Sequence, residues 1–257
     1  MKKYVFTSGL PRAGTTLLGT ILNQNPRFSA SISGPLARFT RAIIQESSSQ
    51  GGYRFECPPE KRKTLIKGLF ENYYDDQTKE VCINHNRGWG LLLPTIKDLF
   101  PESKMIICVR DIKDILNSFE HLQRKNPYSF TSMFSPDENI NVYTRCDTLL
   151  NQGRTLGFAY AAVKQAITSE FKHDIMILDY VQLAKYPEMT LKAIYNFIDE
   201  PYFDHDFDNV EASYDEFDDE IQLPGLHTTR KRVEYIENEM IIPPDILNRI
   251  SGMEVWK

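Results

Sequence analysis

The stretch that decides the fold is TSGLPRAGTTLL, residues 7–18. It follows the short apolar run 4–6 and precedes residues 16–24, which have the spacing of a helix. A strand, a glycine-rich turn and a helix in this order form an anion-binding loop, because successive backbone N–H groups point inward and the helix N-terminus adds partial positive charge. The stretch therefore predicts a site for a phosphate or sulfate group.

The side chains of this loop differ from those of the common nucleoside-triphosphate-binding motif. Gly9 and Gly14 have its G-x-x-x-x-G spacing, but Thr15 stands where that motif has the lysine that reaches the β- and γ-phosphates. Arg12 places a cation inside the loop instead, where a guanidinium can bond two oxygens of a phosphate or sulfuryl group. The missing lysine counts against a Mg²⁺-dependent kinase or NTPase, which stays open as an alternative.

Composition and charge exclude several other classes of protein. The 257 residues are 41% hydrophobic and 25% charged, as in an ordinary globular chain, and we expect one domain over residues 1–257. The net charge of −5 argues against nucleic acid as a partner. The four cysteines are widely spaced, and Cys82 and Cys108 lie in apolar runs, which predicts buried thiols. We expect a cytoplasmic protein, because the sequence has neither a membrane-spanning run nor the apolar core of a signal peptide.

Apolar runs typical of strands alternate with runs typical of helices. The expected strands are residues 4–6, 81–83, 105–109 and 175–178, and the expected helices are residues 16–24, 91–100, 113–122, 157–171 and 187–198. The strands are short, apolar and β-branched, as in a parallel sheet that is covered on both faces. The pattern predicts a three-layer α/β fold of P-loop-like topology, with a central parallel sheet flanked by helices.

Three segments interrupt the alternation. Residues 46–80 and 121–151 read as insertions on the side of the acceptor, because insertions in α/β scaffolds usually lie at the edge where ligands bind. Residues 204–220 include nine acidic residues, which favours a cationic acceptor or, as a simpler interpretation, a solvated surface loop.

A second motif, MIICVRDIKDILNSF, occupies residues 105–119. Arg110 ends the expected strand, Asp111 can cap the following helix, and Ser118 lies about two turns into that helix. An arginine at the carboxyl end of a strand and a serine on the next helix can reach one ligand group at the edge of the sheet.

Together, the two motifs resemble those of the sulfotransferases that use 3′-phosphoadenosine 5′-phosphosulfate (PAPS). In that family a loop like residues 11–16 holds the 5′-phosphosulfate. The resemblance extends to residues 100–104 (FPESK) and 178–187 (LDYVQLAKYP), so it covers most of the chain. It assigns the 5′-phosphosulfate to Arg12, Ala13, Gly14, Thr15 and Thr16.

The same resemblance assigns the rest of the nucleotide. An arginine and a serine spaced like Arg110 and Ser118 hold the 3′-phosphate in the family, and a tyrosine placed like Tyr180 contacts adenine. Members often carry a basic segment near the C-terminus that closes over the 3′-phosphate. Arg230 and Lys231 are the candidates for that role, and a solvated basic turn is the alternative.

Three residues depart from the usual pattern of the family. Arg12 stands where many members have lysine, which keeps the charge, and Ala13 replaces a common serine, which removes a hydroxyl. Ile112 replaces the proline of the usual Arg-Asp-Pro, which leaves the start of the helix less rigid. None of these changes abolishes the nucleotide site.

His85 is the candidate for the group that acts on the acceptor. It directly follows an expected strand at the same sheet edge as the loop, and an unperturbed pKa near 6.5 suits proton abstraction. Cytosolic sulfotransferases similarly place a catalytic histidine after the equivalent strand, whereas bacterial look-alikes tend to have a charge-stabilising lysine there. The tyrosylprotein branch uses a glutamate after the first helix, but the matching residues 29–36 contain no acid. His85 is therefore expected as base or charge stabiliser, with a structural histidine as the alternative.

The expected reaction is in-line transfer of a sulfuryl group from PAPS to a hydroxyl or amine, with 3′-phosphoadenosine 5′-phosphate (PAP) as the product. Arg12 and the loop amides would stabilise the developing negative charge, and no metal is expected. The acceptor class (small molecule, sugar or peptide) stays open. So does a protein that binds PAP or PAPS without catalysing transfer.

Overall fold

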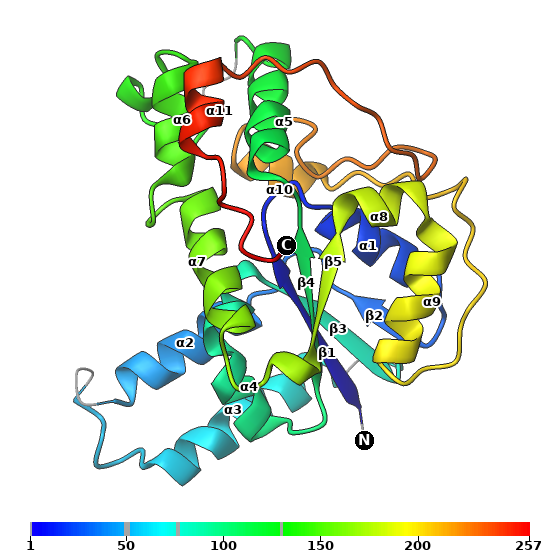
Figure 1. Cartoon of the computed structure of the whole chain (residues 1–257). Coiled ribbons are helices and arrows are strands. Elements are labelled where there is room, and N and C mark those ends of the chain that lie inside the picture. Colours follow the sequence, from blue (N-terminus) through cyan, green and yellow to red (C-terminus); the bar gives the residue numbers. More distant parts are fainter. Residues whose placement is uncertain (1, 49–51, 76–77, 129–130) are drawn as a thin grey trace.

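A computed structural model of the chain describes residues 2–48, 52–75, 78–128 and 131–257. Five parallel strands in this part form one sheet, in the order β2-β3-β1-β4-β5 (Figure 1). The strands are β1 (Lys3–Gly9), β2 (Phe28–Ala30), β3 (Val81–His85), β4 (Lys104–Val109) and β5 (Ile175–Asp179). The predicted α/β fold with a central parallel sheet is confirmed, and β2 is a strand that the apolar pattern did not predict.

Helices cover both faces of this sheet. The α-helices are α1 (Thr15–Leu22), α2 (Leu36–Glu46), α3 (Pro59–Tyr73), α4 (Leu93–Leu99), α5 (Ile112–Lys125), α6 (Val142–Leu150), α7 (Thr155–Ile167), α8 (Tyr180–Lys185), α9 (Pro187–Phe197), α10 (Asp215–Glu220) and α11 (Pro244–Arg249). Three short 3₁₀ helices are η1 (Arg87–Leu92), η2 (Asp137–Asn139) and η3 (Lys172–Asp174). Figure 1 shows α1, α8 and α9 on one side of the sheet and α2, α3, α4 and α7 on the other.

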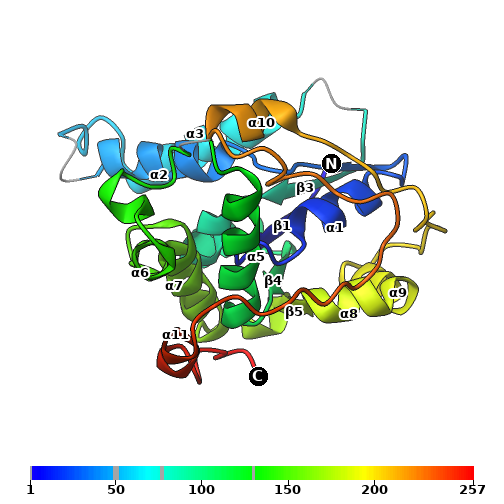
Figure 2. The ribbon, with the colours of Figure 1, turned by 90° about the horizontal axis from the view of Figure 1, so that it is seen from above.

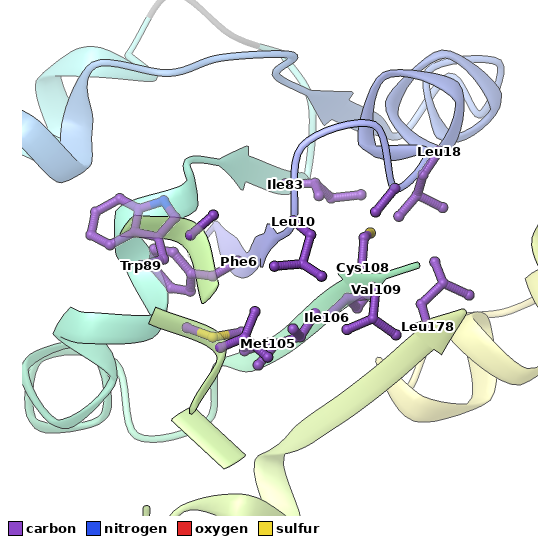
Figure 3. Packing of buried hydrophobic residues seen from close by; sticks show 14 of the residues in the cluster. Phe6, Leu10, Leu18, Ile83, Trp89, Met105, Ile106, Cys108, Val109 and Leu178 are labelled. Carbon is purple, nitrogen blue, oxygen red and sulfur yellow. The ribbon is translucent and has the colours of Figure 1, made fainter. Parts of the chain in front are cut away.

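Aromatic side chains fill the layer between the sheet and η1. Phe6 of β1 packs edge-on against Trp89 of η1, with ring centroids 5.0 Å apart, and also contacts Phe70 of α3. Figure 3 shows Phe6 and Trp89 beside Leu10 and the β4 residue Met105. On the opposite face, Phe28 of β2 stacks on Tyr195 of α9 at 5.3 Å. Alternate residues of the central strands thus enter two apolar layers, which holds the carboxyl ends of the strands in place.

The segment between α10 and α11 crosses the carboxyl end of the sheet. Seen from above, the segment after α10 passes α8 and α5 before it reaches α11 (Figure 2). Asn117 of α5 fixes this segment, because its amide donates to the carbonyl of Glu239 at 2.9 Å and its oxygen accepts from the N–H of Ile241 at 2.9 Å. The segment therefore lies over the sheet edge where the predicted site residues converge.

No helix within the described residues is long and apolar enough to cross a membrane. The four cysteines are all free and buried, as predicted for Cys82 and Cys108. Two of the predicted helices differ most from the structure. Residues 91–100 are divided between η1 and α4, and the helix predicted to reach residue 171 ends at Ile167.

Candidate functional site

A cavity of about 1210 Å³ lies at the carboxyl end of the strands, where ligands bind in sheets of this type. Residues from the β1–α1 loop, the ends of β3 and β4, and helices α2 and α5 line it, and the segment 220–238 forms a further wall. The cavity therefore brings together the two motifs that are about 100 residues apart in the sequence, together with parts of the C-terminal segment.

The loop between β1 and α1 needs its glycines for steric reasons. Gly9 has φ 137°, and a Cβ there would lie 2.1 Å from the carbonyl oxygen of Cys108 on β4. Gly14 has φ 82° and serves as the N-cap of α1 with no side-chain cap bond. The first N–H groups of α1 thus face the cavity edge without a capping side chain from Gly14, as an anion site at a helix N-terminus requires.

Arg12 lies inside this loop and joins it to α5. Its backbone is in the left-handed region, with φ 59°, and its Nε donates to the hydroxyl of Ser118 at 3.1 Å. Its Nη1 also donates to the carbonyl of Leu226 in the C-terminal segment. The predicted phosphosulfate and 3′-phosphate residues are therefore in direct contact with each other.

Arg110 brings a second guanidinium to the same place. It follows β4 directly, and its Nη1 donates to the carbonyl of Arg12 at 3.1 Å. Burial, and then the nearby charge of Arg110, lowers the pKa of Arg12 to about 10. Two like charges in a desolvated setting repel each other, and an anion bound between them would relieve that repulsion.

Tyr180 is the third element of this cluster. The Arg110 guanidinium carbon lies 4.4 Å from the centroid of its ring, a cation–π contact. A Cβ on Gly14 would lie 2.8 Å from Cδ2 of the same ring, so Tyr180 packs directly against the loop. Both neighbours of the tyrosine are thus predicted phosphate-binding residues, and the ring lines the cavity.

His85 is the last residue of β3 and lines the cavity at the next strand. Its Nδ1 lies 3.1 Å from the hydroxyl of Thr7, its register partner on β1, and its N–H donates to Ser31 at 2.8 Å. Burial, and then the charge of Arg87, lowers the pKa of His85 to about 3. The imidazole is therefore neutral at physiological pH.

Several cavity residues were not predicted from the sequence as site residues. His227 lies beside Asp218, with Nδ1 2.7 Å from the carboxylate, and Arg38, Arg41 and Arg154 line the cavity as well. Asp218 and His227 are nine positions apart in the sequence, a separation that matches no known spacing motif. The available signal for Arg38 and Arg41 was their spacing of three residues on α2, whereas Arg154 lies at the start of α7.

Only some of the other predicted cofactor residues line the cavity. Thr15, Thr16 and Arg230 line the cavity, whereas Ala13 is fully buried and Lys231 is exposed outside the cavity lining. Arg230 lies 4.0 Å from the carboxylate of Glu234, which also lines the cavity. Of the two basic candidates in the C-terminal segment, the structure brings only Arg230 to the site.

Two local expectations were wrong. Asp111 occupies the N-cap position of α5, but its carboxylate pairs with Lys257 at 2.5 Å and makes no cap bond. His205 lies in the stretch 204–220, for which a solvated surface loop was one interpretation, but it is buried among aromatic rings with Nε2 3.0 Å from the hydroxyl of Tyr195. Within the described ranges, no three His, Cys, Asp or Glu side chains are grouped closely enough to hold a metal ion.

Solved structures share this fold. The sulfotransferase domain from the curacin biosynthetic pathway matches with a TM-score of 0.53 and 15% identity, over 79% of this chain and 76% of that chain. Retinol dehydratase in a complex with retinol and PAP matches with a TM-score of 0.52 and 14% identity, over 98% of this chain and 80% of that chain. At these identities the likeness concerns the fold alone.

Sequence comparison identifies the family. Protein-tyrosine sulfotransferase A of Caenorhabditis elegans is 22% identical over 245 residues, which are 87% of this chain and 60% of that protein. The chain spans about half the length of the curated relatives that it matches. The family model described as "Sulfotransferase family" matches residues 5–204, which include the two predicted phosphate-binding motifs, His85 and Tyr180. The chain therefore belongs to the sulfotransferase family.

Proposed function

We propose that the protein transfers a sulfuryl group from PAPS to a hydroxyl or amine acceptor and releases PAP. The observation that carries the proposal is the pair of guanidiniums at the loop. Arg110 Nε is buried and has no hydrogen-bond partner within the described chain, and Arg110 Nη1 already touches the backbone of Arg12. A buried, unsatisfied cationic donor is costly unless an anion completes its bonds.

The residues fit the nucleotide part by part. Arg12, Gly14, Thr15 and Thr16 would hold the 5′-phosphosulfate, Arg110, Ser118 and Arg230 the 3′-phosphate, and Tyr180 the adenine. PAPS supplies an activated sulfuryl group on a good leaving group. The loop would stabilise the charge that develops when the bond between sulfur and the 5′-phosphate oxygen breaks. Thr15 in place of the motif lysine makes the kinase or NTPase alternative the weaker one.

The transfer consists of three events. The acceptor oxygen or nitrogen forms its bond to sulfur, its proton passes to a base, and PAP leaves with the electron pair of the broken bond. His85 faces the cavity in its neutral form and can hydrogen-bond the acceptor through Nε2, because Nδ1 is engaged by Thr7. Arg87 follows it in the cavity wall and adds positive charge for the transferred group.

The charges on the acceptor side favour an anionic acceptor. Arg38, Arg41, Lys125 and Arg154 line this part of the cavity, and Glu220 is the one member of the acidic stretch 204–220 in the described lining. The cationic acceptor that the sequence suggested is therefore disfavoured, since most of that stretch lies elsewhere. Tyrosine in an acidic peptide is the first acceptor to test, because the curated relative is named for protein tyrosine.

Calorimetric titration with PAP, and with ATP plus Mg²⁺ for comparison, tests the cofactor class. Tight binding of PAP without metal, followed by PAPS-dependent sulfation of an acidic tyrosine peptide, is expected. Preference for ATP with Mg²⁺ would overturn the proposal in favour of the kinase or NTPase. Tight PAP binding without transfer to peptide, phenol, sugar or amine would instead identify a binding protein that has lost catalysis.

A further inference from the structure

We propose that His227, oriented by Asp218, is the general base that takes the proton from the acceptor. The proposal rests on the proposed sulfuryl transfer and adds a residue to it. Asp218 and His227 both lie outside residues 5–204, the part that the family model matches. His227 lines the cavity because the segment after α10 folds back across the sheet edge (Figure 2), and Asp218 contacts it from α10 without lining the cavity itself.

Asp218 holds His227 through three bonds. One carboxylate oxygen lies 2.7 Å from Nδ1 of the imidazole, and the backbone N–H of His227 donates to both carboxylate oxygens at 3.1 Å. Asp218 is only 2% exposed, so water screens its charge little. The carboxylate accepts from Nδ1–H and thereby fixes the tautomer in which Nε2 is the proton-accepting nitrogen.

The surroundings of His227 lower its pKa overall. Burial lowers the pKa of His227, Asp218 raises it, and the charges of Arg87 and Arg12 lower it further, so the net shift is downward. This shift favours the neutral imidazole that a base requires, and the imidazolium that forms during transfer lies against a buried carboxylate. This is the arrangement by which a carboxylate supports a histidine base in acyl-transfer enzymes.

The comparison with His85 decides which histidine takes the proton. His85 has a neutral hydroxyl, that of Thr7, on Nδ1. The charge of Arg87 lowers the pKa of both histidines, so the partner on Nδ1 makes the difference. His227 has the carboxylate that His85 lacks. The two rings are close enough for His227 to lower the pKa of His85, so both line the same part of the cavity. His85 then serves as a neutral hydrogen-bonding partner of the acceptor.

Four charged or titratable groups lie near His227, each on a different element of the fold. Asp218 lies on α10, Arg87 begins η1, Arg12 lies in the β1–α1 loop, and His85 ends β3. Three of the four groups are cationic or neutral, and Asp218 is the single carboxylate among them. The base strength of His227 therefore depends on Asp218, which makes Asp218 a positioning residue.

Two phenols of different acidity test the proposal. Unsubstituted phenol holds its proton at mildly alkaline pH and needs a base, whereas 4-nitrophenol is mostly ionised and does not. With PAPS as donor, His227→Gln should lower kcat with phenol by about 10²–10³-fold and with 4-nitrophenol only a few-fold. His85→Gln should lower both rates to a similar degree, and His173→Gln, an exposed position on η3, is the matched control that should change neither.

Asp218 is tested by the pH profile. Asp218→Asn should lower the rate with phenol, and it should move the acid limb of kcat/KM to lower pH because the remaining neighbours of His227 depress its pKa. Asp218→Glu should restore part of the rate. Equal losses with both phenols in His227→Gln would indicate a structural role and overturn the proposal, as would an unchanged rate with phenol.

A second measurement keeps the proposal separate from the proposed function. If wild-type protein binds PAP but sulfates neither phenol, the proposed transfer to phenols fails. ¹⁵N NMR of the His227 imidazole then tests the pair of Asp218 and His227. His227 should show a protonated Nδ1, and its pKa should rise when PAP adds negative charge and fall in Asp218→Asn. A His227 signal that is unaffected by PAP and by Asp218→Asn would place the ring outside the reacting site and overturn the proposal.

Discussion

The guanidinium of Arg12 donates from Nε to the hydroxyl of Ser118 at 3.1 Å, across 106 residues of sequence. This bond joins the loop after β1 to the second turn of α5. Each residue comes from a different motif, and each is assigned to a different phosphate of the nucleotide. The residues of the two predicted phosphate sites therefore form one connected cationic cluster, with Arg110 bonded to the backbone of Arg12.

Ser118→Ala tests this link with a small change. Removing the hydroxyl leaves Arg12 Nε without its partner and removes a donor for the 3′-phosphate. Because a single hydrogen bond contributes about 1 kcal/mol net, PAP should bind roughly fivefold more weakly. Calorimetric titration with PAP measures the change, and unchanged affinity would remove Ser118 from the nucleotide site.

Arg110→Ala should have a larger effect. The half-buried side chain lies between the Arg12 carbonyl and the ring of Tyr180, with its Nε fully buried, so its loss removes a partly desolvated charge from the predicted 3′-phosphate site. We expect a loss of about 2–4 kcal/mol, or roughly 30- to 1000-fold in Kd for PAP. Arg249→Ala removes only an exposed pair with Asp147 and serves as the control. Equal PAP affinity in the two variants would contradict the assignment.

Gly14→Ala separates backbone strain from contact with Tyr180. Both Gly14 and Gly252 have φ 82°, but a Cβ at Gly14 would lie 2.8 Å from the Tyr180 ring, and one at Gly252 meets nothing within 4 Å. Each variant should lose about 1–2 kcal/mol of unfolding free energy from the left-handed backbone. Only Gly14→Ala should weaken PAP binding, because the tyrosine must move. Thermal unfolding and titration with PAP measure the two effects, and equal PAP binding by both variants would remove Tyr180 from the adenine site.

The order of strands and helices could be predicted from the sequence because the central strands β3 and β4 are almost entirely buried. Residues 105–109 form a continuous apolar run, and all of them are buried in β4. The strand β2 (Phe28–Ala30) has three residues and one polar side chain, too few for a pattern. The cytoplasmic location and the single domain stay predictions.

The site could be predicted as far as its residues lie in local motifs. Arg12, Gly14, Arg110 and Ser118 belong to such motifs, and the structure brings them together. Asp218 and His227 meet only because α10 and the following turn fold back on each other, which no spacing rule describes. For the same reason the sequence could not distinguish Arg230, which reaches the cavity, from its exposed neighbour Lys231.

The double variant Arg38→Ala/Arg41→Ala tests the anionic acceptor. Both side chains are exposed on α2 and line the cavity away from the loop. For an acidic tyrosine peptide we expect KM to rise about three- to tenfold, with PAP affinity unchanged and with a weaker dependence of KM on salt. A neutral tyrosine peptide is the control substrate, and its KM should hardly change. A proportionate rise for both peptides would show that the arginines contribute shape rather than charge.

The burial of His85 predicts how stability depends on pH. Burial, and then Arg87, lowers the pKa of His85 to about 3 in the folded protein, whereas the unfolded chain binds this proton near pH 6.5. Between these values the unfolded state holds more protons, so the unfolding free energy falls as pH falls. His85 adds at most about 1.4 kcal/mol per pH unit to this slope. Chemical denaturation between these pH values should show a shallower slope for His85→Gln than for wild type, with the exposed His173→Gln variant retaining the wild-type slope. Parallel slopes in wild type and His85→Gln would mean that His85 titrates alike in the folded and unfolded states.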